Sequence, residues 1–548
     1  MSSQIHLREG IGLSQDSYIA DVLERRRAVL EQIDSAEFGW FHIRACIVSG
    51  IGFFTDAYDI FAINLVSTML GFVYWKEQGG HTPHAVETTL KVTCSIGTMF
   101  GQLVFGWLAD RLGRKRMYGV ELIIIIIGTV GQSFAGNGPA VAFWGIIAFW
   151  RVILGIGIGG DYPLSSVITA EFATTKRRGA MMAAVFAMQG FGQLAASVVG
   201  LIGTVAYQNA IREDPNYLDY VWRIVIGVGA VPALFALYYR LVLPETPRFT
   251  MDVEQKVEKG ISDAQAFIDY GAAAGDYSDN IAVARINVSP HASWADFRAY
   301  FGQWKHFKVL FGCAYSWFAL DVAWYGLGLN SSVILQKIGF AGGFDSSDVE
   351  GYAPYDAVFR VCVGNIIINL LGSIPGYWIS VFTIDRLGRK TIQIMGFIML
   401  TIFFIVLGFA YDAILKTSLP LFIVIYTLAQ VFFNFGPNTT TFIVPGECFP
   451  TRYRSTAHGI SAAAGKLGSI VAQVGFGLLK DIGGYNAWIN HLLQIFALFM
   501  LSGIFSSLLI PETKGKTLEE LSGERRRSTI EEERDSTPLQ EYYQKGTY

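Results

Sequence analysis

Ionisable side chains inside long apolar stretches are the residues of this sequence best suited to do chemistry. Asp56 and Asp59 lie three positions apart in one such stretch, so a helix places both carboxyls on one face. Two carboxylates held that close repel each other, and one of them should hold a proton near neutral pH. The alternative is a solvated, idle pair at the water boundary. The spacing favours a pair that takes up and releases protons.

A second apolar stretch carries Arg151 and Asp161 on either side of a glycine-rich run, GIGIGG at 155–160. The two charges are ten residues apart, which corresponds to about 15 Å of helix. Arg151 could therefore pair with Asp56 or Asp59 on a neighbouring helix. The glycines alone are explained by close helix packing. Asp161 is interpreted as functional, because an acid at membrane depth is costly.

A third stretch carries an aromatic stripe with an acid at its centre. Trp317, Asp321 and Tyr325 follow at intervals of four residues and so lie along one face of a helix. An aromatic stripe alone usually indicates packing, but a central Asp is not easily packed against lipid. We therefore expect this stripe to line a substrate cavity.

Further polar side chains interrupt three other apolar stretches. Gln189 is followed one turn later by Gln193, Asn434 is followed one turn later by Asn438, and Lys466 stands alone among small residues. Amides at depth can satisfy each other across helices, which is the structural alternative for Gln189 and Asn438. A lone ammonium requires an acid or an anion as its partner, with a snorkelling lysine as the alternative.

The elements that must position these residues are about twelve apolar stretches of membrane-spanning length. Hydrophobic residues make up 52% of the 548 residues and charged residues only 16%, against about 25% charged residues in soluble domains. A spanning helix needs about 20 mostly apolar residues. The expected spans are 43–72, 89–109, 118–138, 141–166, 179–207, 222–243, 309–335, 359–384, 392–412, 418–446, 456–480 and 487–510. The sequence therefore predicts an all-α polytopic membrane protein.

Basic residues gather at alternate ends of these spans. They cluster at 25–27, 111–116, 176–178, 386–390 and 525–527, whereas the loops 76–88, 135–141 and 337–358 are nearly bare of them. By the positive-inside rule, both termini and the polar segment 244–308 face the cytosol. The expected organisation is a tail at 1–42, a six-helix bundle at 43–243, a cytosolic loop at 244–308, a second bundle at 309–510 and a tail at 511–548.

An internal repeat relates the two predicted bundles. The matching pairs are DRLGRK at 110–115 and 385–390, Glu171 and Glu447 ahead of basic residues, and Pro-Glu-Thr at 244–246 and 511–513. Two six-span halves in the same order place a substrate site at their interface, near the middle of the membrane. Tyr162 and Asn438 occupy matching places in the two halves, as a site on a pseudo-symmetry axis requires.

Several strings resemble known transporter motifs. The outer strings are the two DRLGRK loops, PETPR at 244–248, PGECFPTRYR at 445–454 and PETKGKTLEE at 511–520. They resemble the major facilitator superfamily. More narrowly, GGDYPLSS at 159–166 and NFGPNTTTF at 434–442 resemble the fungal and plant proton-coupled phosphate transporters. The likeness is strongest to the fungal high-affinity plasma-membrane phosphate symporters, and it covers nearly the whole chain.

This resemblance implies a fold, a cargo and roles for the residues above. It implies a major facilitator fold that carries inorganic phosphate inward with protons by alternating access. The implied phosphate ligands are Tyr162, Gln189, Trp317, Asp321, Tyr325 and Asn438, with Asn434 as an alternative to Asn438. The implied proton pathway consists of Asp56, Asp59, Arg151, Asp161 and Asp321.

The remaining charged residues are assigned to selectivity, release and gating. Asp321 could select phosphate over sulfate, because dihydrogen phosphate carries hydroxyl protons that a carboxylate can accept. Lys466 could attract phosphate, or release it by competing for Asp321. The loop acids Asp110, Asp385, Glu171 and Glu447 are interpreted as interdomain salt-bridge latches that favour the outward-open state.

Other functions fit the sequence less well. A proton-coupled hexose transporter shares the outer motifs, but Asp321 and GGDYPLSS argue against it. A receptor that binds phosphate and signals through 249–305 can coexist with transport. The sequence holds no nucleophile–base pair, P-loop or metal cluster, so no enzyme, cofactor or metal is expected. The expected partners are inorganic phosphate, protons and the lipid bilayer, without nucleic acid, and the oligomeric state is left open.

Overall fold

The computed structural model describes residues 15–242, 245–254, 256, 259–260, 264, 293–337, 354–484 and 486–523. Within these residues the chain is helical and contains no β-strand, as predicted. Ten helices or pairs of helices are long and apolar enough to cross a membrane. Helices α4 (Arg114–Ser133) and α13 (Trp304–Gly328) bring the number to twelve. These two helices are less apolar than the other ten because each carries several charged side chains.

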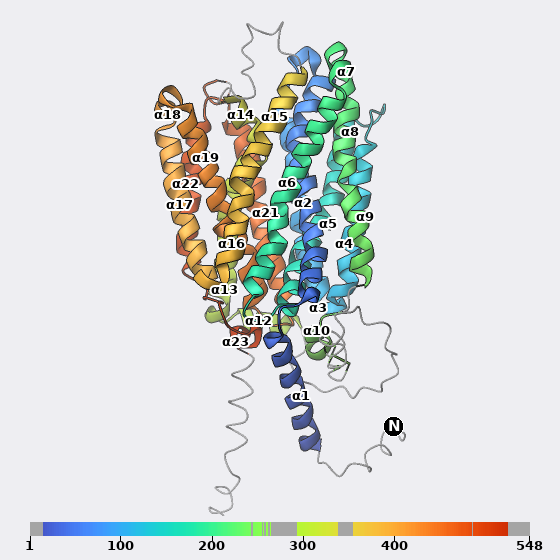
Figure 1. The fold of residues 1–548 in the computed structure, drawn as a ribbon, viewed down its shortest axis with the longest axis vertical. Coiled ribbons are helices and arrows are strands. Elements are labelled where there is room, and N and C mark those ends of the chain that lie inside the picture. Colours follow the sequence, from blue (N-terminus) through green and yellow to red (C-terminus); the bar gives the residue numbers. More distant parts are fainter. Residues whose placement is uncertain are drawn as a thin grey trace, which may run out of the picture.

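The N-terminal half contains six membrane-length rods, shown from blue to green in Figure 1. They are α2 (Trp40–Tyr74), α3 (His84–Leu112), α4, α5 (Phe143–Phe172), α6 (Arg178–Ala206) and the pair α8 (Leu218–Val228) and α9 (Ala230–Val242). The pair α8 and α9 forms one rod that is interrupted at Gly229. The short elements between these rods are η1 (Lys76–Gln78), α7 (Gln208–Glu213) and η2 (Pro215–Tyr217).

The C-terminal half repeats this plan with two interrupted rods. Its rods are α13, α15 (Pro354–Ile368) joined to α16 (Ile374–Leu387) by the π-turn η3 (Asn369–Ser373), α17 (Arg389–Phe409), α19 (Leu419–Asn434) with α20 (Pro437–Cys448), α21 (Arg454–Leu479) and α22 (Ile489–Ser507). Short helices α14 (Ser331–Lys337) and α18 (Tyr411–Thr417) lie between the rods. Pro437 opens α20 at the break after α19, where its missing N–H costs no helical hydrogen bond.

Glycines bring α3 and α5 into direct backbone contact. A Cβ atom on Gly97 or Gly101 would lie 2.2 Å from a backbone carbonyl oxygen of α5. A Cβ atom on Gly155 or Gly159 would lie 2.3 Å from a carbonyl oxygen of α3. The glycine-rich run therefore packs helices, as its first interpretation held. The tight crossing fixes the part of α5 that carries Asp161.

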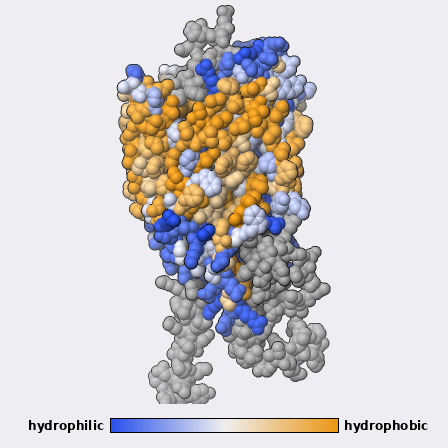
Figure 2. All heavy atoms as spheres, viewed as in Figure 1, coloured by the Kyte–Doolittle hydropathy of each residue, from blue (hydrophilic) through white to orange (hydrophobic). Residues whose placement is uncertain are grey.

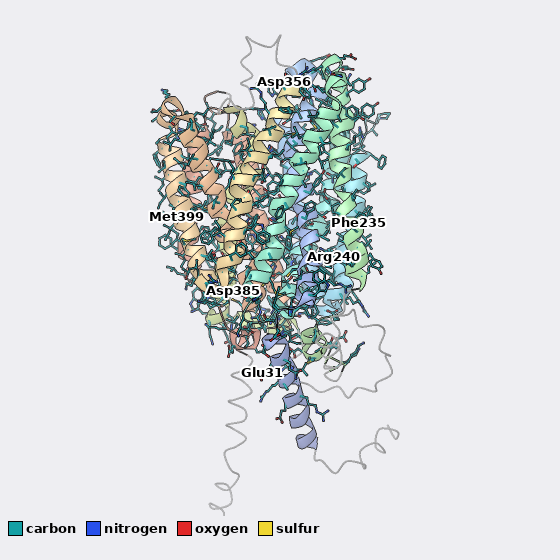
Figure 3. The ribbon with its side chains drawn as sticks, in the orientation of Figure 1. Glu31, Phe235, Arg240, Asp356, Asp385 and Met399 are labelled. Atoms are coloured by element: carbon teal, nitrogen blue, oxygen red, sulfur yellow. The ribbon has the colours of Figure 1, made fainter. Side chains whose placement is uncertain are left out.

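The surface of the bundle has a broad apolar belt between two polar ends (Figure 2). Large apolar side chains in this belt are exposed, for example Phe235 at 67% and Phe409 at 74%. In Figure 3, Phe235 and Met399 flank the bundle at mid-height, while Glu31 and Asp356 mark its two ends. Exposed apolar side chains at this density fit contact with lipid.

Both ends of the described chain lie at the same end of the bundle. This end, called the terminal face below, carries α1 (Gln15–Ser35), α10 (Pro247–Asp252), α12 (Trp294–Phe301) and α23 (Leu518–Ser522) (Figure 1). Helices α7, α14 and α18 lie at the opposite face. The four helices of the terminal face fall in segments predicted as tails or as the central loop. Most of that loop, the basic cluster at 525–527 and much of the loop 337–358 lie outside the described residues.

Candidate functional site

The six predicted phosphate ligands come together at the interface of the two halves. They lie on α5 (Tyr162), α6 (Gln189), α13 (Trp317, Asp321 and Tyr325) and α20 (Asn438), and each side chain is at most 4% exposed. Because α5 and α6 belong to one half and α13 and α20 to the other, both halves contribute. We call these six residues with Lys466 and Tyr377 the central cage.

One side of the central cage is a chain of hydrogen bonds between phenols and amides. The Gln189 amide donates to the Tyr162 hydroxyl at 3.1 Å. The Tyr377 hydroxyl donates to the Gln189 oxygen at 3.2 Å and accepts from the Asn438 amide at 2.9 Å. Tyr377, on α16, was missed in the sequence, since one tyrosine in an apolar span carries no distinguishing signal. It connects the amides of the two halves.

The geometry bears on the choice between the two asparagines. The Asn438 amide donates both to Tyr377 and, at 2.7 Å, to the Asn434 oxygen. The Asn434 amide donates at 3.0 Å to the backbone carbonyl of Gln430 in its own helix. Asn438 therefore lies in the hydrogen-bond chain of the central cage, and Asn434 supports it from behind.

The other side of the central cage is a buried ion pair. The Lys466 ammonium lies 3.3 Å from an Asp321 carboxylate oxygen and donates to the Tyr325 hydroxyl at 2.6 Å. It also lies 4.1 Å from the centre of the Tyr325 ring and 4.9 Å from that of Tyr162. Gly465 makes this approach possible, because a Cβ there would lie 2.5 Å from Trp317. The central cage therefore holds one positive and one negative group in contact.

A second buried set of charges lies in the N-terminal half, next to α5. The Arg240 guanidinium donates at 2.8 Å to Asp161 and also forms an ion pair with Glu121 on α4. Both carboxylate oxygens of Asp56 are buried nearby, and neither has a hydrogen-bond partner among the described residues. We call Asp56, Glu121, Asp161 and Arg240 the acid cluster. Gly52 makes room for it, since a Cβ there would lie 1.7 Å from Arg240.

The acid cluster differs from the predicted pathway in its arginine. Arg151 donates to the backbone carbonyl of Leu90 at 2.6 Å and forms no ion pair with any described residue. It lies well before Asp161 along α5, which puts its guanidinium beside the backbone of α3. Asp59 instead accepts from Thr129 at 2.8 Å. The arginine that pairs with the acids is therefore Arg240, which the sequence analysis missed.

Two loop acids tie the halves together at the terminal face. Asp110, at the end of α3, accepts from the backbone N–H groups of Ser455 and Thr456 at 3.2 and 2.7 Å. Asp385, at the end of α16, accepts from the backbone N–H groups at 179 and 180, at 3.2 and 2.9 Å. Each acid thus meets the start of a helix of the other half, where unpaired N–H groups attract anions. The pseudo-symmetry of the sequence repeat reappears in these contacts.

The two repeat glutamates are not equivalent. Glu171 accepts from Arg454 of the other half at 2.8 Å, as expected of an interdomain latch. Glu447 lies 2.9 Å from Arg389 of its own half and also accepts from Thr513. The interdomain expectation is therefore corrected for Glu447, because Arg389 and Thr513 occupy its oxygens. Its role is to hold Arg389, which in turn contacts Asp385 at 2.8 Å.

The helices of the terminal face add a further tie, which we call the brace. Arg248 of α10 lies 3.0 Å from Asp34 of α1 and 2.9 Å from Glu519 of α23. Arg178 of α6 donates to the backbone carbonyl of Lys516 at 3.0 Å. Burial acts to raise the pKa of Glu519, but the Arg248 guanidinium outweighs it and lowers that pKa to about 2. The brace is therefore charged at any physiological pH.

Comparison with known sequences gives the family. The profile of the sugar (and other) transporter family matches residues 45–524. The chain belongs to this family. Transporter relatives include the repressible high-affinity phosphate permease of Neurospora crassa, which is 49% identical and aligned over 96% of this chain and 94% of its own. The inorganic phosphate transporter PHO84 of Saccharomyces cerevisiae is also 49% identical, over 94% and 91% of the two chains.

A more distant relative and a solved structure complete the comparison. The low affinity inorganic phosphate transporter 3 of Petunia hybrida is 39% identical over 90% of this chain and 95% of its own. The major facilitator proton:xylose symporter XylE superposes with a TM-score of 0.66 at 20% identity, over 88% of this chain and 98% of XylE. The predicted major facilitator fold and the predicted family are both confirmed.

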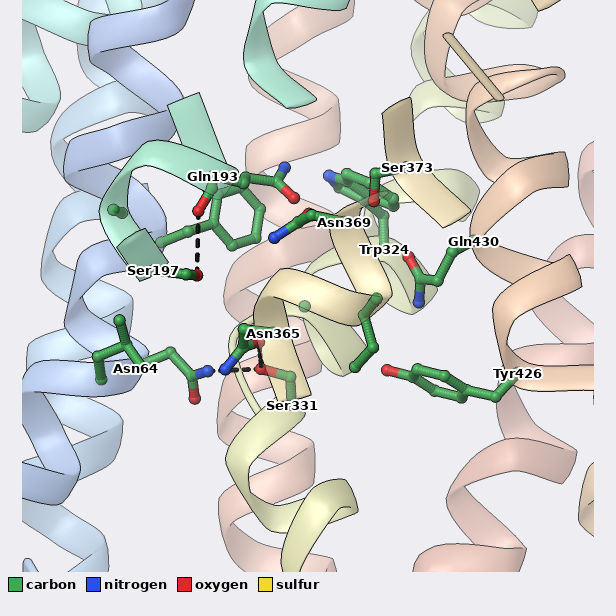
Figure 4. A pocket seen from close by; sticks show the side chains of 15 residues that line it. Asn64, Gln193, Ser197, Trp324, Ser331, Asn365, Asn369, Ser373, Tyr426 and Gln430 are labelled. Atoms are coloured by element: carbon green, nitrogen blue, oxygen red, sulfur yellow. Dashed lines mark hydrogen bonds between the residues drawn. The ribbon is translucent and has the colours of Figure 1, made fainter. Parts of the chain in front are cut away.

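This family member is closed toward both faces. At the opposite face, Asn64 of α2 donates to Ser331 at 2.5 Å, and Lys91 of α3 donates to Asn330 at 2.8 Å. Between these contacts and the central cage lies a polar cavity of about 40 Å³, lined by both halves (Figure 4). The latches and the brace close the terminal face. The structure is thus an occluded arrangement of the described residues, and the preference of the latches for the outward-open state stays a prediction.

Proposed function

We propose that this protein transports inorganic phosphate inward together with protons, by alternating access, across the plasma membrane. The observation that carries the proposal is the buried central cage, which lies between two halves closed at both faces. Relatives at 49% identity that are named as phosphate permeases and transporters support the cargo. By the positive-inside rule, the terminal face is cytosolic.

The chemistry of the central cage suits dihydrogen phosphate. Lys466 supplies one positive charge, while the phenols, amides and indole supply neutral hydrogen-bond donors. Asp321 supplies an acceptor for a hydroxyl proton of the substrate, which sulfate lacks at neutral pH. Lys466 contacts Asp321 at 3.3 Å. An arriving phosphate displaces Asp321 as the partner of Lys466. The return of Lys466 to Asp321 then assists release of the phosphate.

The acid cluster suits proton carriage. It holds three acids around a single arginine, so all three acids cannot be ionised and compensated at once. No hydrogen-bond donor of the described chain contacts the Asp56 oxygens, which favours the neutral, protonated form of this acid. Opening toward water ionises it. Moving one negative charge inward against 100 mV costs about 2.3 kcal/mol, and one proton per dihydrogen phosphate cancels that cost. Further protons make uptake electrogenic.

The first test is uptake of labelled phosphate by the purified full chain in liposomes, with an imposed inward proton gradient. We expect uptake that collapses with a protonophore and that excess unlabelled phosphate inhibits. Sulfate and glucose should not compete. Competition by glucose, or uptake indifferent to the proton gradient, would contradict the proposed cargo or its coupling.

Alternating access requires the tight α3–α21 crossing at the terminal face to separate and re-form. A Cβ on Gly459 of α21 would lie 2.2 Å from the backbone carbonyl of Gln102 on α3. We expect Gly459→Leu to hold the halves apart there and to reduce uptake at least about tenfold, since a rigid clash of this kind costs about 1–3 kcal/mol or more.

Opening can be followed by maleimide labelling of Ser166→Cys, in a background in which the native cysteines are replaced. Ser166 donates to the Phe442 carbonyl across the interface at 3.4 Å and is fully buried. In detergent, Ser166→Cys should be labelled faster when combined with Gly459→Leu than when combined with a control substitution. Gly475→Leu is the matched control on the same helix, because no atom lies within 4 Å of a Cβ there. Equal labelling rates in the two variants would argue against the proposed opening.

A further inference from the structure

A second polar cavity lies at the opposite face, outside the central cage. It has a volume of about 320 Å³ and is lined by both halves. The N-terminal half contributes the end of α2, the loop before α3 and the first turn of α3, while the C-terminal half contributes α14 and the end of α21. With the terminal face on the cytosolic side, this cavity opens toward the outside of the cell, from which the solute arrives.

The ammonium group that lines this cavity, that of Lys480, is only loosely paired. Glu87 on α3 lies 2.6 Å from Lys91 of its own helix and 3.6 Å from Lys480 of the other half. Lys91 therefore holds the carboxylate more closely, although both ammonium groups share it. His84 pairs with Asp481 at 3.0 Å, and His81 also lines the cavity. The side chain of Lys480 is only 5% exposed. A buried ammonium with so long a contact to a shared carboxylate can gain a closer anionic partner.

An unpaired hydroxyl gives an independent sign that a ligand belongs here. Ser67 of α2 lines the cavity and is 5% exposed, and its Oγ atom has no hydrogen-bond partner among the described residues. Buried hydroxyls are nearly always paired, so an orphan in a polar cavity calls for a partner. Thr68, Ser332 and Gln336 add further donors to the lining. Among the described residues of the lining, Glu87 is the only carboxylate.

We propose that this cavity is an outer capture site for the dihydrogen phosphate anion, in which Lys480 supplies the charge and Ser67 a hydrogen bond. The proposal rests on the proposed function. The anion competes with Glu87 for Lys480. Because Glu87 and Lys480 belong to different halves, their separation removes one of the contacts that close the opposite face. Capture of the cargo therefore favours opening toward the central cage.

Lys480→Gln tests the capture site in the full chain reconstituted in liposomes. We expect the KM for phosphate to rise about tenfold or more, the usual effect of losing one charged contact, while the maximal rate stays within about twofold. Lys480→Arg should restore the KM. Lys76→Gln is the matched control, because Lys76 carries the same charge at the same face but pairs with Asp214 outside the cavity. It should leave the KM unchanged.

A binding measurement separates this proposal from the proposed function. The double variant Asp321→Asn with Lys466→Met removes both charges of the central cage, so equilibrium binding of labelled phosphate to that variant reports the outer site. We expect weak binding that added Lys480→Gln or Ser67→Ala removes. An unchanged KM in Lys480→Gln, an equal rise in Lys76→Gln, or binding insensitive to both outer substitutions would overturn the capture site. A wild-type chain that transports no phosphate would overturn the proposed function and the capture site together.

Discussion

Asp321→Asn is expected to reduce proton-driven phosphate uptake by about 10- to 100-fold, because a hydrogen bond to a charged group contributes about 1.5–3 kcal/mol. The asparagine amide keeps the size of the side chain. Its single neutral oxygen, however, is a weaker acceptor for a phosphate hydroxyl than a charged carboxylate is. It also leaves Lys466, only 3% exposed, without its carboxylate. The measurement is initial uptake in liposomes at matched protein density.

Loss of a buried charge partner can also destabilise the fold, by about 3–5 kcal/mol, so uptake alone does not prove a role in binding. The double variant Asp321→Asn with Lys466→Met removes both charges and should recover thermal stability without recovering uptake. Asp356→Asn, a partly exposed acid at the opposite face, is the control. Normal uptake by the double variant would show that neither charge belongs to the phosphate site.

Asp56→Asn is expected to separate phosphate movement from proton movement. Asparagine resembles the protonated acid, and both Asp56 oxygens already lack hydrogen-bond partners, so the fold should tolerate the change. Accumulation driven by a pH gradient should fall at least about tenfold, the usual scale for loss of a proton-transfer group. Exchange of internal for external phosphate, which needs no net proton movement, should persist.

The contrast between the two assays is the decisive measurement for Asp56. Asp214→Asn serves as the control, since Asp214 is a half-exposed acid at the opposite face. If Asp56→Asn accumulates phosphate against a pH gradient as the wild type does, the acid cluster does not carry the coupling proton. If exchange is lost as well, Asp56 belongs to the general transport cycle rather than to coupling.

Much of the fold follows from features that are local in the sequence. Length and composition of the apolar stretches predict the spans, and the DRLGRK repeat predicts two equivalent halves. The repeat also explains why Asp110 and Asp385 make matching contacts with the start of a helix in the other half. The interrupted rods were predicted as single spans, because the π-turn η3 and the break at Gly229 lie in strongly apolar sequence.

The pairing of charges between helices was harder to predict. Arg240 lies near the end of its span, next to exposed Tyr238 and Tyr239, so it resembles an interfacial anchor in the sequence. Only the packing of α9 against α4 and α2 turns its guanidinium inward. Arg151 sits deeper in its span and was predicted to pair with Asp56 or Asp59, whereas Arg240 forms the ion pairs with Asp161 and Glu121. The type of side chain was thus enough to identify the acids. Which arginine pairs with them depends on how each helix is rotated about its own axis, which the sequence does not show directly.

The brace can form only after both halves of the chain have been synthesised. Asp34 and Arg248 lie before the second half in the sequence, whereas Glu519 follows it. A ribosome therefore delivers both six-helix halves to the membrane before Glu519 can reach Arg248. The seal of the terminal face is completed last, after each half has already been inserted. A nascent chain passes through a stage in which both halves are in the membrane but this tie between them does not yet exist.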